Sequence, residues 1–179
     1  MTSFTITVDD KAVQAKLKAL SARAFNMDAV LQTIGEGIVE RTKRRFETST
    51  DPAGQPWKPN SAATLAMLAD RLSGQKSKVK KDGSLNAAGL RAYANKKPLI
   101  GESQDLRRQF TISVRGGTLT IGSTPVYAAI QQFGGKAGRG RKVTILARPF
   151  LPIHRDGTLY PADQAEIIRA LNAYLMDTS

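Results

Sequence analysis

The residues that could do chemistry are few, and they form no recognisable catalytic set. The only glycine-rich stretch that could hold a phosphate is Gly134–Lys142, which reads GGKAGRGRK. Phosphate-binding loops aim backbone N–H groups at the anion from the turn between a strand and a helix. The sequence around this stretch does not predict that context, so a flexible basic hairpin tip is the simpler interpretation.

Acid–base and metal chemistry have equally few candidates. The chain has no cysteine, which excludes disulfides, thiolate metal sites and cysteine nucleophiles. Its one histidine, His154, lies in a segment expected to be extended, with no partner that would orient it as a base. The carboxylates of Asp9, Asp10, Glu36 and Glu40 are interpreted as helix caps and surface charges. We therefore expect no catalytic residue, no cofactor and no metal.

The net charge is the strongest compositional signal. The chain carries +12, and two segments hold most of it: residues 71–97 carry +7 and residues 136–155 carry +6. Such segments can bind a polyanion or an acidic protein surface, or can simply be solvated. Grooves for nucleic acid usually interleave basic with aromatic residues, but Tyr93 is the only aromatic residue of 71–97. The basic residues considered for subunit or partner contacts are Lys78, Lys80, Lys81, Lys136, Arg139, Arg141 and Lys142.

Length and composition indicate one ordinary globular domain over residues 1–179. Hydrophobic residues make up 41% of the 179 residues, which is enough for one modest core. No stretch approaches about 18 consecutive apolar residues, so no membrane span is expected. The N-terminal MTSFTITVDD is acidic and alternating, which is unlike a secretion signal, and synthesis in the cytoplasm is expected.

The N-terminal third predicts a strand and two helices. Alternation over Thr2–Val8 favours a half-buried strand, and Asp9 or Asp10 could cap a first helix. The spacing of Val13, Leu17 and Leu20 supports that helix. A second, longer helix could be capped by Asn26 or Asp28, and its stripe consists of Leu31, Ile34, Ile38 and Phe46. Gly35 and Gly37 inside it indicate close packing against a neighbour, or a kink.

The middle of the chain is rich in loop signals. Residues 48–59 contain three prolines and a glycine, which favours a loop. Ser61–Leu72 has helical spacing, with Leu65, Leu68 and Leu72 on one face. Residues 73–97 lose that periodicity and are predicted to form a long, basic, mobile loop, because loops of this length are usually functional or disordered.

The segment Phe110–Gly122 predicts a β-hairpin. Gly116-Gly117 tolerates the positive φ angles of a tight turn. That turn places Val114 opposite Leu119 and Ile112 opposite Ile121, so one face of both strands is apolar and the register is fixed.

The C-terminal part completes an α+β fold. Val126–Phe133 predicts a short helix or turn, with Tyr127, Ile130 and Phe133 on one face. Residues 135–142 form a basic, glycine-rich loop, Val143–Leu146 a strand and Asp163–Met176 an amphipathic helix. The expected architecture is a small, mostly antiparallel sheet with a central hairpin, packed against the long helix and the C-terminal helix.

Several short motifs occur in a recognisable order. They are Phe46, Asp51-Pro52-x-Gly54-x-x-Trp57-x-Pro59, Ile121-Gly122, Tyr127-Ala128-Ala129-Ile130-Gln131-Gln132-Phe133-Gly134 and Ala147-Arg148-Pro149-Phe150-Leu151. From about Leu31 to Leu175 the chain resembles the phage virion morphogenesis, or tail completion, family of Mu-like and P2-like phages and prophages. The last two motifs also resemble head–tail connector and tail-terminator proteins. One departure is Gln104, which stands where the family's L-x-x-T-G-x-L segment has glycine. The turn that this glycine would form is therefore not predicted from the sequence.

The motif residues have mainly structural interpretations. Asp51-Pro52-x-Gly54 predicts a turn that returns Trp57 to the helix end at Phe46. Arg148 is held extended by Pro149, and its guanidinium could pair with a carboxylate of its own or of an adjacent subunit. Gly134, Pro149 and Phe150 are assigned structural roles by the same resemblance.

The resemblance implies a non-enzymatic virion protein of the tail or neck that completes the tail and joins it to the head. By the same resemblance it acts as a ring, with a hexamer matching tail symmetry. Its partners would be other copies of itself and other tail and neck proteins, with possible non-specific contact with DNA. A stand-alone nucleic-acid-binding protein and a capsid-assembly accessory factor remain alternatives that use the same charge.

Overall fold

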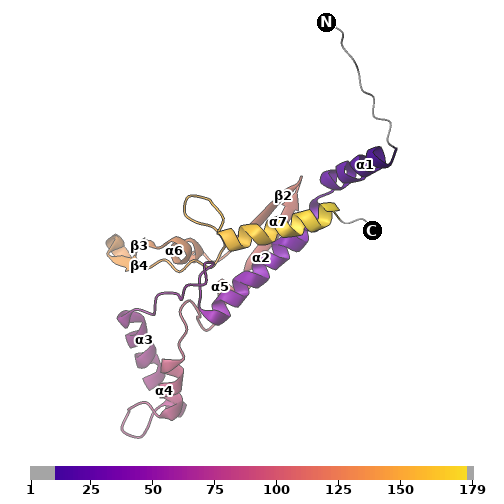
Figure 1. The fold of residues 1–179 in the computed structure, drawn as a ribbon. Helices are drawn as coiled ribbons and strands as arrows, with labels where there is room; N and C mark the ends of the chain where they lie inside the picture. The colour runs from indigo at the N-terminus through magenta and orange to yellow at the C-terminus, as the bar shows by residue number, and fades with distance from the viewer. Residues whose placement is uncertain (1–10, 177–179) are drawn as a thin grey trace.

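The structure, a computed structural model, describes residues 11–176 and shows an elongated molecule (Figure 1). The whole chain exposes 12731 Å², whereas a compact monomer of this mass exposes about 8,500 Å². Projecting parts of the fold contribute to this excess (Figure 1). The strand predicted over Thr2–Val8 lies outside the described residues.

Helix α2 (Asp28–Thr48) is the centre of the fold. It packs against the hairpin of β1 (Phe110–Arg115) and β2 (Thr118–Ser123) and against the C-terminal helix α7 (Pro161–Met176). The shared core consists of Val30, Ile34 and Ile38, with Leu119, Ile121, Ile167, Leu171 and Tyr174 packed around them. The predicted α+β arrangement of hairpin, long helix and C-terminal helix is confirmed.

The start of α2 differs from the prediction. Met27 occupies the N-cap position without a side-chain hydrogen bond, so neither Asn26 nor Asp28 caps the helix. Asp28 instead lies in the first turn, where its charge faces the positive end of the helix dipole.

The hairpin has the predicted register, with Ile112 opposite Ile121 and Val114 opposite Leu119. Gly35 of α2 allows the hairpin to approach closely. A Cβ atom at Gly35 would lie 2.8 Å from Ile112 Cγ2 and 2.9 Å from Leu119 Cδ1. Gly35 therefore marks close packing, which was one of its two sequence-based interpretations.

A second core lies at the C-terminal end of α2. It contains Phe46, Trp57, Leu106, Ala128 and Phe150, drawn from α2, the loop after it, α5 (Asp105–Arg108), α6 (Ala128–Phe133) and the segment before α7. The rings of Phe46 and Trp57 meet edge to face at 5.2 Å between centroids, and those of Phe46 and Phe150 lie 5.4 Å apart. The fold thus brings five segments of the chain to one hydrophobic cluster.

The turn before α5 forms even though glycine is absent. Gln104 adopts the left-handed conformation, with φ 56° and ψ 27°, immediately before α5. This conformation is unusual for a residue with a side chain. Leu106 follows it and is 2% exposed, so burial of this leucine in the second core accompanies the unusual backbone.

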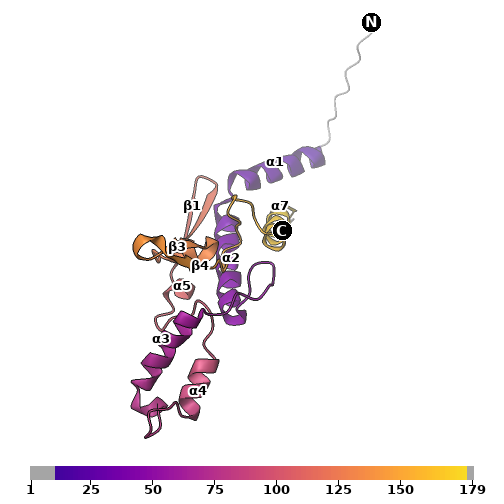
Figure 2. The same cartoon turned by 90° about the vertical axis from the view of Figure 1, so that its left-hand side faces the viewer.

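Residues 62–97 form a helical arm that projects from the body (Figure 2). It consists of α3 (Ala62–Ser73), the short helix η1 (Lys76–Lys78) and α4 (Ala87–Ala94). The predicted loop over 73–97 is therefore wrong at α4. Asn86 caps α4 by accepting a hydrogen bond from Gly89 N at 3.0 Å, and eight residues are too few for a clear helical period. The predicted mobility of this segment stays a prediction.

The basic glycine-rich stretch is the tip of a second hairpin. Strands β3 (Gly135–Ala137) and β4 (Val143–Ile145) pair antiparallel, and the short helix η2 (Arg139–Arg141) forms the tip. The antiparallel structure of the described residues is thus divided between two separate two-stranded sheets. Gly134 precedes β3 with φ 69°, and its missing side chain leaves room for the backbone of Ala147.

Two loops repeat one local design. The segments Val79–Leu85 (VKKDGSL) and Ile153–Leu159 (IHRDGTL) each close with an isolated β-bridge between their end residues. In both, the aspartate Oδ1 accepts hydrogen bonds from the N–H (2.9 Å) and the hydroxyl (2.7 Å) of the residue two positions later. In both, the intervening glycine has a positive φ, 82° and 88°. These hydrogen bonds lower the pKa of both carboxyl groups.

Candidate assembly surfaces

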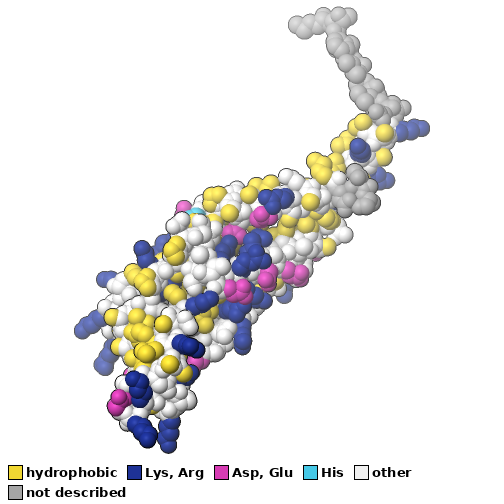
Figure 3. Space-filling model, turned by 60° about the horizontal axis from the view of Figure 1, so that its bottom comes forward, with side chains coloured by type: hydrophobic (Ala, Val, Ile, Leu, Met, Phe, Trp, Pro, Cys, Tyr) yellow, Lys and Arg dark blue, Asp and Glu magenta, His cyan; other side chains and the backbone are white. Residues whose placement is uncertain are grey.

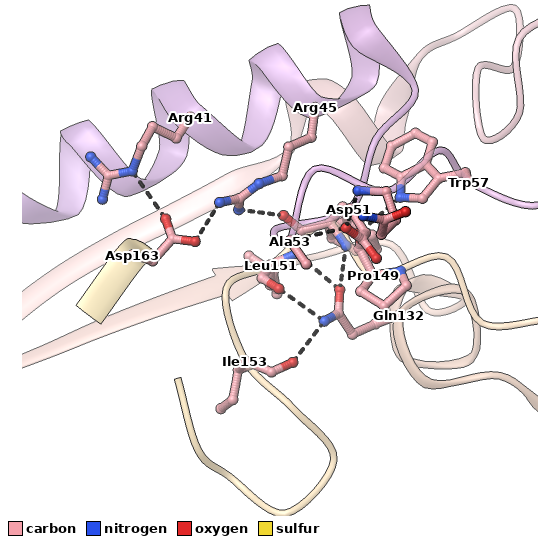
Figure 4. Close-up of polar contacts among 12 residues, drawn as sticks. Arg41, Arg45, Asp51, Ala53, Trp57, Gln132, Pro149, Leu151, Ile153 and Asp163 are labelled. Carbon is pink, nitrogen blue, oxygen red and sulfur yellow. Dashed lines mark hydrogen bonds and ion pairs between the residues drawn. The ribbon is translucent and has the colours of Figure 1, made fainter. Parts of the chain in front are cut away.

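The Ala147–Leu151 motif is held by side chains from three other parts of the chain (Figure 4). Arg45 Nη1 donates to Phe150 O at 2.9 Å. Trp57 Nε1 donates to Pro149 O at 2.8 Å. Gln132 Oε1 accepts from Phe150 N and Leu151 N at 2.8 and 2.9 Å. Side chains thus satisfy the backbone groups of Pro149, Phe150 and Leu151, while Arg148 N donates to the backbone Gln131 O at 2.8 Å.

Gln132 uses both the oxygen and the nitrogen of its side-chain amide at the junction, the name used here for the contacts of Arg45, Trp57 and Gln132 with the Ala147–Leu151 motif. Besides accepting two hydrogen bonds, its Nε2 donates to Leu151 O and Ile153 O, each at 3.0 Å. The residue is 2% exposed. Its four bonds link α6 to the segment before α7 and explain why a polar side chain is buried here.

A buried ion pair ties α2 to α7. Asp163 is 1% exposed, and it accepts from Arg41 Nε at 3.0 Å and from Arg45 Nη2. Burial lowers the pKa of the Arg45 guanidinium, and the charge of Asp163 acts in the opposite direction. Because Arg45 also bonds Phe150 O, one side chain joins α2, α7 and the Ala147–Leu151 motif.

The turn after α2 forms as predicted. Asp51 Oδ1 accepts hydrogen bonds from Ala53 N at 2.9 Å and Gln55 N at 2.8 Å, and Gly54 has φ +80°. Trp57 N then donates to Ser49 O at 2.8 Å. These bonds return Trp57 to Phe46, where both rings are buried, and Pro52 is buried beside the turn.

Arg148 contacts carbonyl groups instead of the carboxylate expected as one possibility. Its Nε donates to Lys58 O at 2.8 Å and its Nη2 to Pro59 O at 2.7 Å. Partial burial lowers the pKa of this guanidinium. Arg148 therefore joins the Ala147–Leu151 motif to the base of the α3–α4 arm.

The expected apolar face of α6 is shifted. Tyr127 is 43% exposed, and the buried residues of this helix are Ala128 and Gln132. Ile130 and Phe133 are half-buried. Ala128 packs in the core that contains Phe46, and Gln132 bonds to Phe150. The prediction that Tyr127, Ile130 and Phe133 form the buried face of this helix is therefore wrong.

The predicted basic contact residues fall into two separate groups. Lys78, Lys80 and Lys81 lie on the α3–α4 arm, and Lys136, Arg139, Arg141 and Lys142 lie at the tip of the β3–β4 hairpin. Figures 1 and 2 show these two projections apart in both views. In Figure 3 Lys and Arg side chains are spread over the face in view, and several lie at its lower end. The structure does not bring the two groups into one patch.

Helix α1 (Lys11–Phe25) is the largest surface feature that the sequence did not single out for contacts. Among the described residues it has no buried member, and Leu17 and Phe25 are 60% and 89% exposed. It touches the body through α7. An apolar groove of about 410 Å³ runs between them, lined by Ala15, Ala19, Leu20, Leu175 and Met176 with the stems of Lys16 and Arg23.

A second groove of about 650 Å³ lies between α2 and β1. Glu36 and Glu40 form its acidic side, and Phe110 and Ile112 form its apolar side. Gly37 lies between the two glutamates, and Lys43 lies at one end. The groove thus combines exposed carboxylates with partly buried apolar side chains.

Three residues that organise the junction were missed from the sequence: Arg45, Gln132 and Asp163. Gln132 lies inside a recognised motif, and the remaining signal was its polar side chain on an otherwise apolar helix face. Arg45 precedes Phe46 on the stripe of α2, which is an unusual place for a solvated charge. Pairing across more than 100 residues has no local signal.

Residues considered for chemistry do not converge. The His154 ring stacks on Tyr160 at 3.7 Å between centroids, and burial raises the pKa of Tyr160. Within residues 11–176, no group of three His, Asp or Glu side chains is placed to hold a metal. None of the helices in the same range is long and apolar enough to cross a membrane.

Comparison with known proteins gives a consistent assignment. The chain is 43% identical over 77 residues to the Mu-like prophage FluMu G protein 2 of Haemophilus influenzae, which covers 43% of this chain and 51% of the relative. The match thus spans about half of that relative's length. No solved structure matches the chain. Residues 8–176 match the model of the phage virion morphogenesis family, and the chain therefore belongs to that family.

Proposed function

We propose that this protein is a non-enzymatic structural subunit that completes the phage tail and joins it to the head as a ring. The observation that carries the proposal is α1, a 15-residue amphipathic helix with no buried residue in the described structure. An isolated helix of this length is marginal in water. Its exposed apolar stripe is suited to burial against another subunit.

The distribution of projecting parts supports a ring more than a symmetric pair. Helix α1 extends from one end of the body, and the α3–α4 arm extends from the other (Figure 1). A ring forms when one patch meets a different patch on the next copy and the rotation closes. Two unlike ends are suited to such heterologous contacts.

The basic hairpin tip and the arm are the proposed contacts with neighbouring tail and neck proteins. A ring of +12 subunits carries a large positive charge, which is suited to anionic partners outside the ring. Acidic faces of adjacent rings would supply them. DNA could also be attracted non-specifically.

Complementation in a phage that encodes this protein tests the proposal. Deleting the gene should leave separate heads and unjoined tails in the lysate, and the wild-type gene should restore joined particles, as counted by electron microscopy. Purified protein should form closed rings at high concentration. Normal joined particles without the gene would contradict the tail-completion role, and malformed heads would favour a capsid-assembly factor.

Charge removal separates this function from the nucleic-acid-binding alternative. Replacing Lys136, Arg139, Arg141 and Lys142 by serine should reduce joined particles while the fold stays intact. A true DNA binder with six or more phosphate contacts would lose about 10³–10⁵ in affinity between 50 and 200 mM salt. Normal assembly with reduced DNA affinity would favour the alternative.

A further inference from the structure

Helix α1 has the chemistry of a ligand for an acidic, apolar groove. Its basic residues are Lys11, Lys16, Lys18 and Arg23, and residues 11–25 contain no acidic residue. Val13, Leu17 and Leu20 form its apolar stripe at helical spacing. Leu17 is 60% exposed, so the stripe is open along the outer part of the helix.

The joint between α1 and α2 directs α1 away from the body of its own chain. Arg23 Nη1 donates to Leu175 O at 3.2 Å, and the Tyr174 hydroxyl donates to Asn26 O at 2.6 Å. Both bonds hold the joint against the end of α7. Figure 1 shows α1 continuing beyond that end. Folding α1 back over its own α2 would break both bonds.

The groove between α2 and β1 offers the complementary surface. Glu36 and Glu40 are exposed one turn apart, and Phe110 and Ile112 supply apolar area beside them. In the described part of the chain, β1 pairs only with β2, so its other edge is open to this groove. Lys43 lies at one end of the groove, and the acidic part of the groove consists of Glu36 and Glu40.

The dimensions of helix and groove agree. The groove follows α2 from Thr33 to Lys43, which is about 15 Å of helix. Helix α1 is about 22 Å long, and its stripe from Val13 to Leu20 covers about half of that length. Gly37 lies between the two glutamates and has no side chain. A helix can therefore approach α2 closely at this point.

We infer that α1 of one copy lies in the α2–β1 groove of the next copy, with Lys16, which borders the apolar stripe, facing Glu36 and Glu40. This inference rests on the proposed ring and names the contact that would build it. Pairing of α1 with α1 is disfavoured, because each helix carries four basic residues and no acidic one. The contact joins unlike surfaces, as a closed ring requires.

Charge exchange tests the electrostatic part of the contact. Lys16→Glu, or Glu36→Lys with Glu40→Lys, should each raise the dissociation constant for self-association roughly tenfold or more, because like charges then face each other. All three changes in one chain should restore association. Lys58→Glu makes the same charge change as Lys16→Glu at an exposed site outside the contact, and should leave association unchanged. Sedimentation equilibrium measures all four proteins.

Engineered cysteines test the geometry, because the natural chain has none. Leu17→Cys and Gly37→Cys should be made as separate proteins, mixed and oxidised. A disulfide-linked heterodimer is expected, and the doubly substituted chain should give linked rings or ladders. Leu17→Cys mixed with Thr120→Cys, on the far face of β2, is the control and should give none.

The outcomes separate this contact from the ring itself. If the Lys16→Glu variant still forms rings with the dissociation constant of the wild-type protein, the contact is wrong and the proposed ring stands. A disulfide formed within single chains of the double variant would show α1 folded over its own α2 and would overturn the inference. The inference would also be overturned if the mixed cysteine variants gave no linked heterodimer and the wild-type protein did not self-associate. Counts of joined particles in lysates would test the proposed function independently of that result.

Discussion

Helices α1 and α2 follow one another in the chain, and both carry an apolar stripe, but they differ in how much of that stripe is buried. Eight residues of α2 are buried, whereas none of α1 is buried in the described structure. The stripe of α2 meets the β1–β2 hairpin and α7 within the same chain. Helix α1 contacts the end of α7.

The difference shows that amphipathicity predicts a helix but does not say which chain will cover it. The outer face of α2 mixes acidic and basic residues, while α1 is purely basic. The joint with α7 holds α1 away from the acidic groove of its own chain. Substitutions in α2 should therefore affect stability, and substitutions in α1 should affect association.

The largest contrast is expected between two phenylalanines. Phe46→Ala in α2 should lower the free energy of unfolding by about 3–5 kcal/mol, because the ring is 1% exposed and packs against Trp57 and Phe150. Phe25→Ala in α1, where the ring is 89% exposed, should change it by less than about 0.5 kcal/mol. Urea unfolding measures both. Equal losses would show that α1 is covered within its own chain.

The next contrast concerns the ion pair of α2 and α7. Asp163→Asn should cost about 3 kcal/mol, because it leaves Arg45 buried without a counter-charge. The matched control is Glu166→Gln, which removes an exposed pair with Arg169 on the same helix and should cost well under about 1 kcal/mol. Thermal unfolding of the two variants in parallel decides whether burial sets the difference.

A smaller contrast lies within α2 itself. Gly35→Ala should lower the free energy of unfolding by about 1–3 kcal/mol, because the new methyl group would overlap Ile112 and Leu119. Gly37→Ala meets Arg41 Nη1 at 3.4 Å as its nearest neighbour among the described residues. It should raise stability by up to about 1 kcal/mol through helix propensity. Chemical denaturation should therefore shift in opposite directions, and shifts of the same sign would reject the close approach of the hairpin.

The smallest effect on stability is expected on the outer part of α1. Leu17→Ser should leave the melting temperature of dilute protein unchanged, because the side chain is largely solvated. The same change should weaken self-association. Calorimetry of dilute protein and sedimentation of concentrated protein measure these two properties separately, and a lowered melting temperature in dilute solution would contradict the contrast between the helices.

The sequence predicted the elements whose signals are local. Gly116-Gly117 determined the turn and hence the register of β1 and β2, because a one-residue shift would turn every apolar side chain outward. Asp51 and Gly54 likewise determined their own turn. The same local reasoning failed at α4, where eight residues give little more than two turns, and at the start of α2, where two polar residues lie beside the true N-cap, Met27.

The junction could not be predicted, because its partners are far apart in sequence. Gln132 binds the backbone of residues 150–153, and Arg45 binds Asp163 118 positions later. Backbone carbonyls carry no sequence signal for the side chain that will reach them. Gln104 shows a second limit, since it adopts a left-handed backbone that its residue type does not favour.

The twin loops Val79–Leu85 and Ile153–Leu159 have a consequence for the kinetics of folding. Their internal hydrogen bonds join residues no more than four positions apart, and they form alike at the end of the arm and beside α7. Short hairpins of this kind close within about 1–10 μs. Both loops can therefore form before either core assembles, which shortens the search that brings α3 to α4 and the segment after Phe150 to α7.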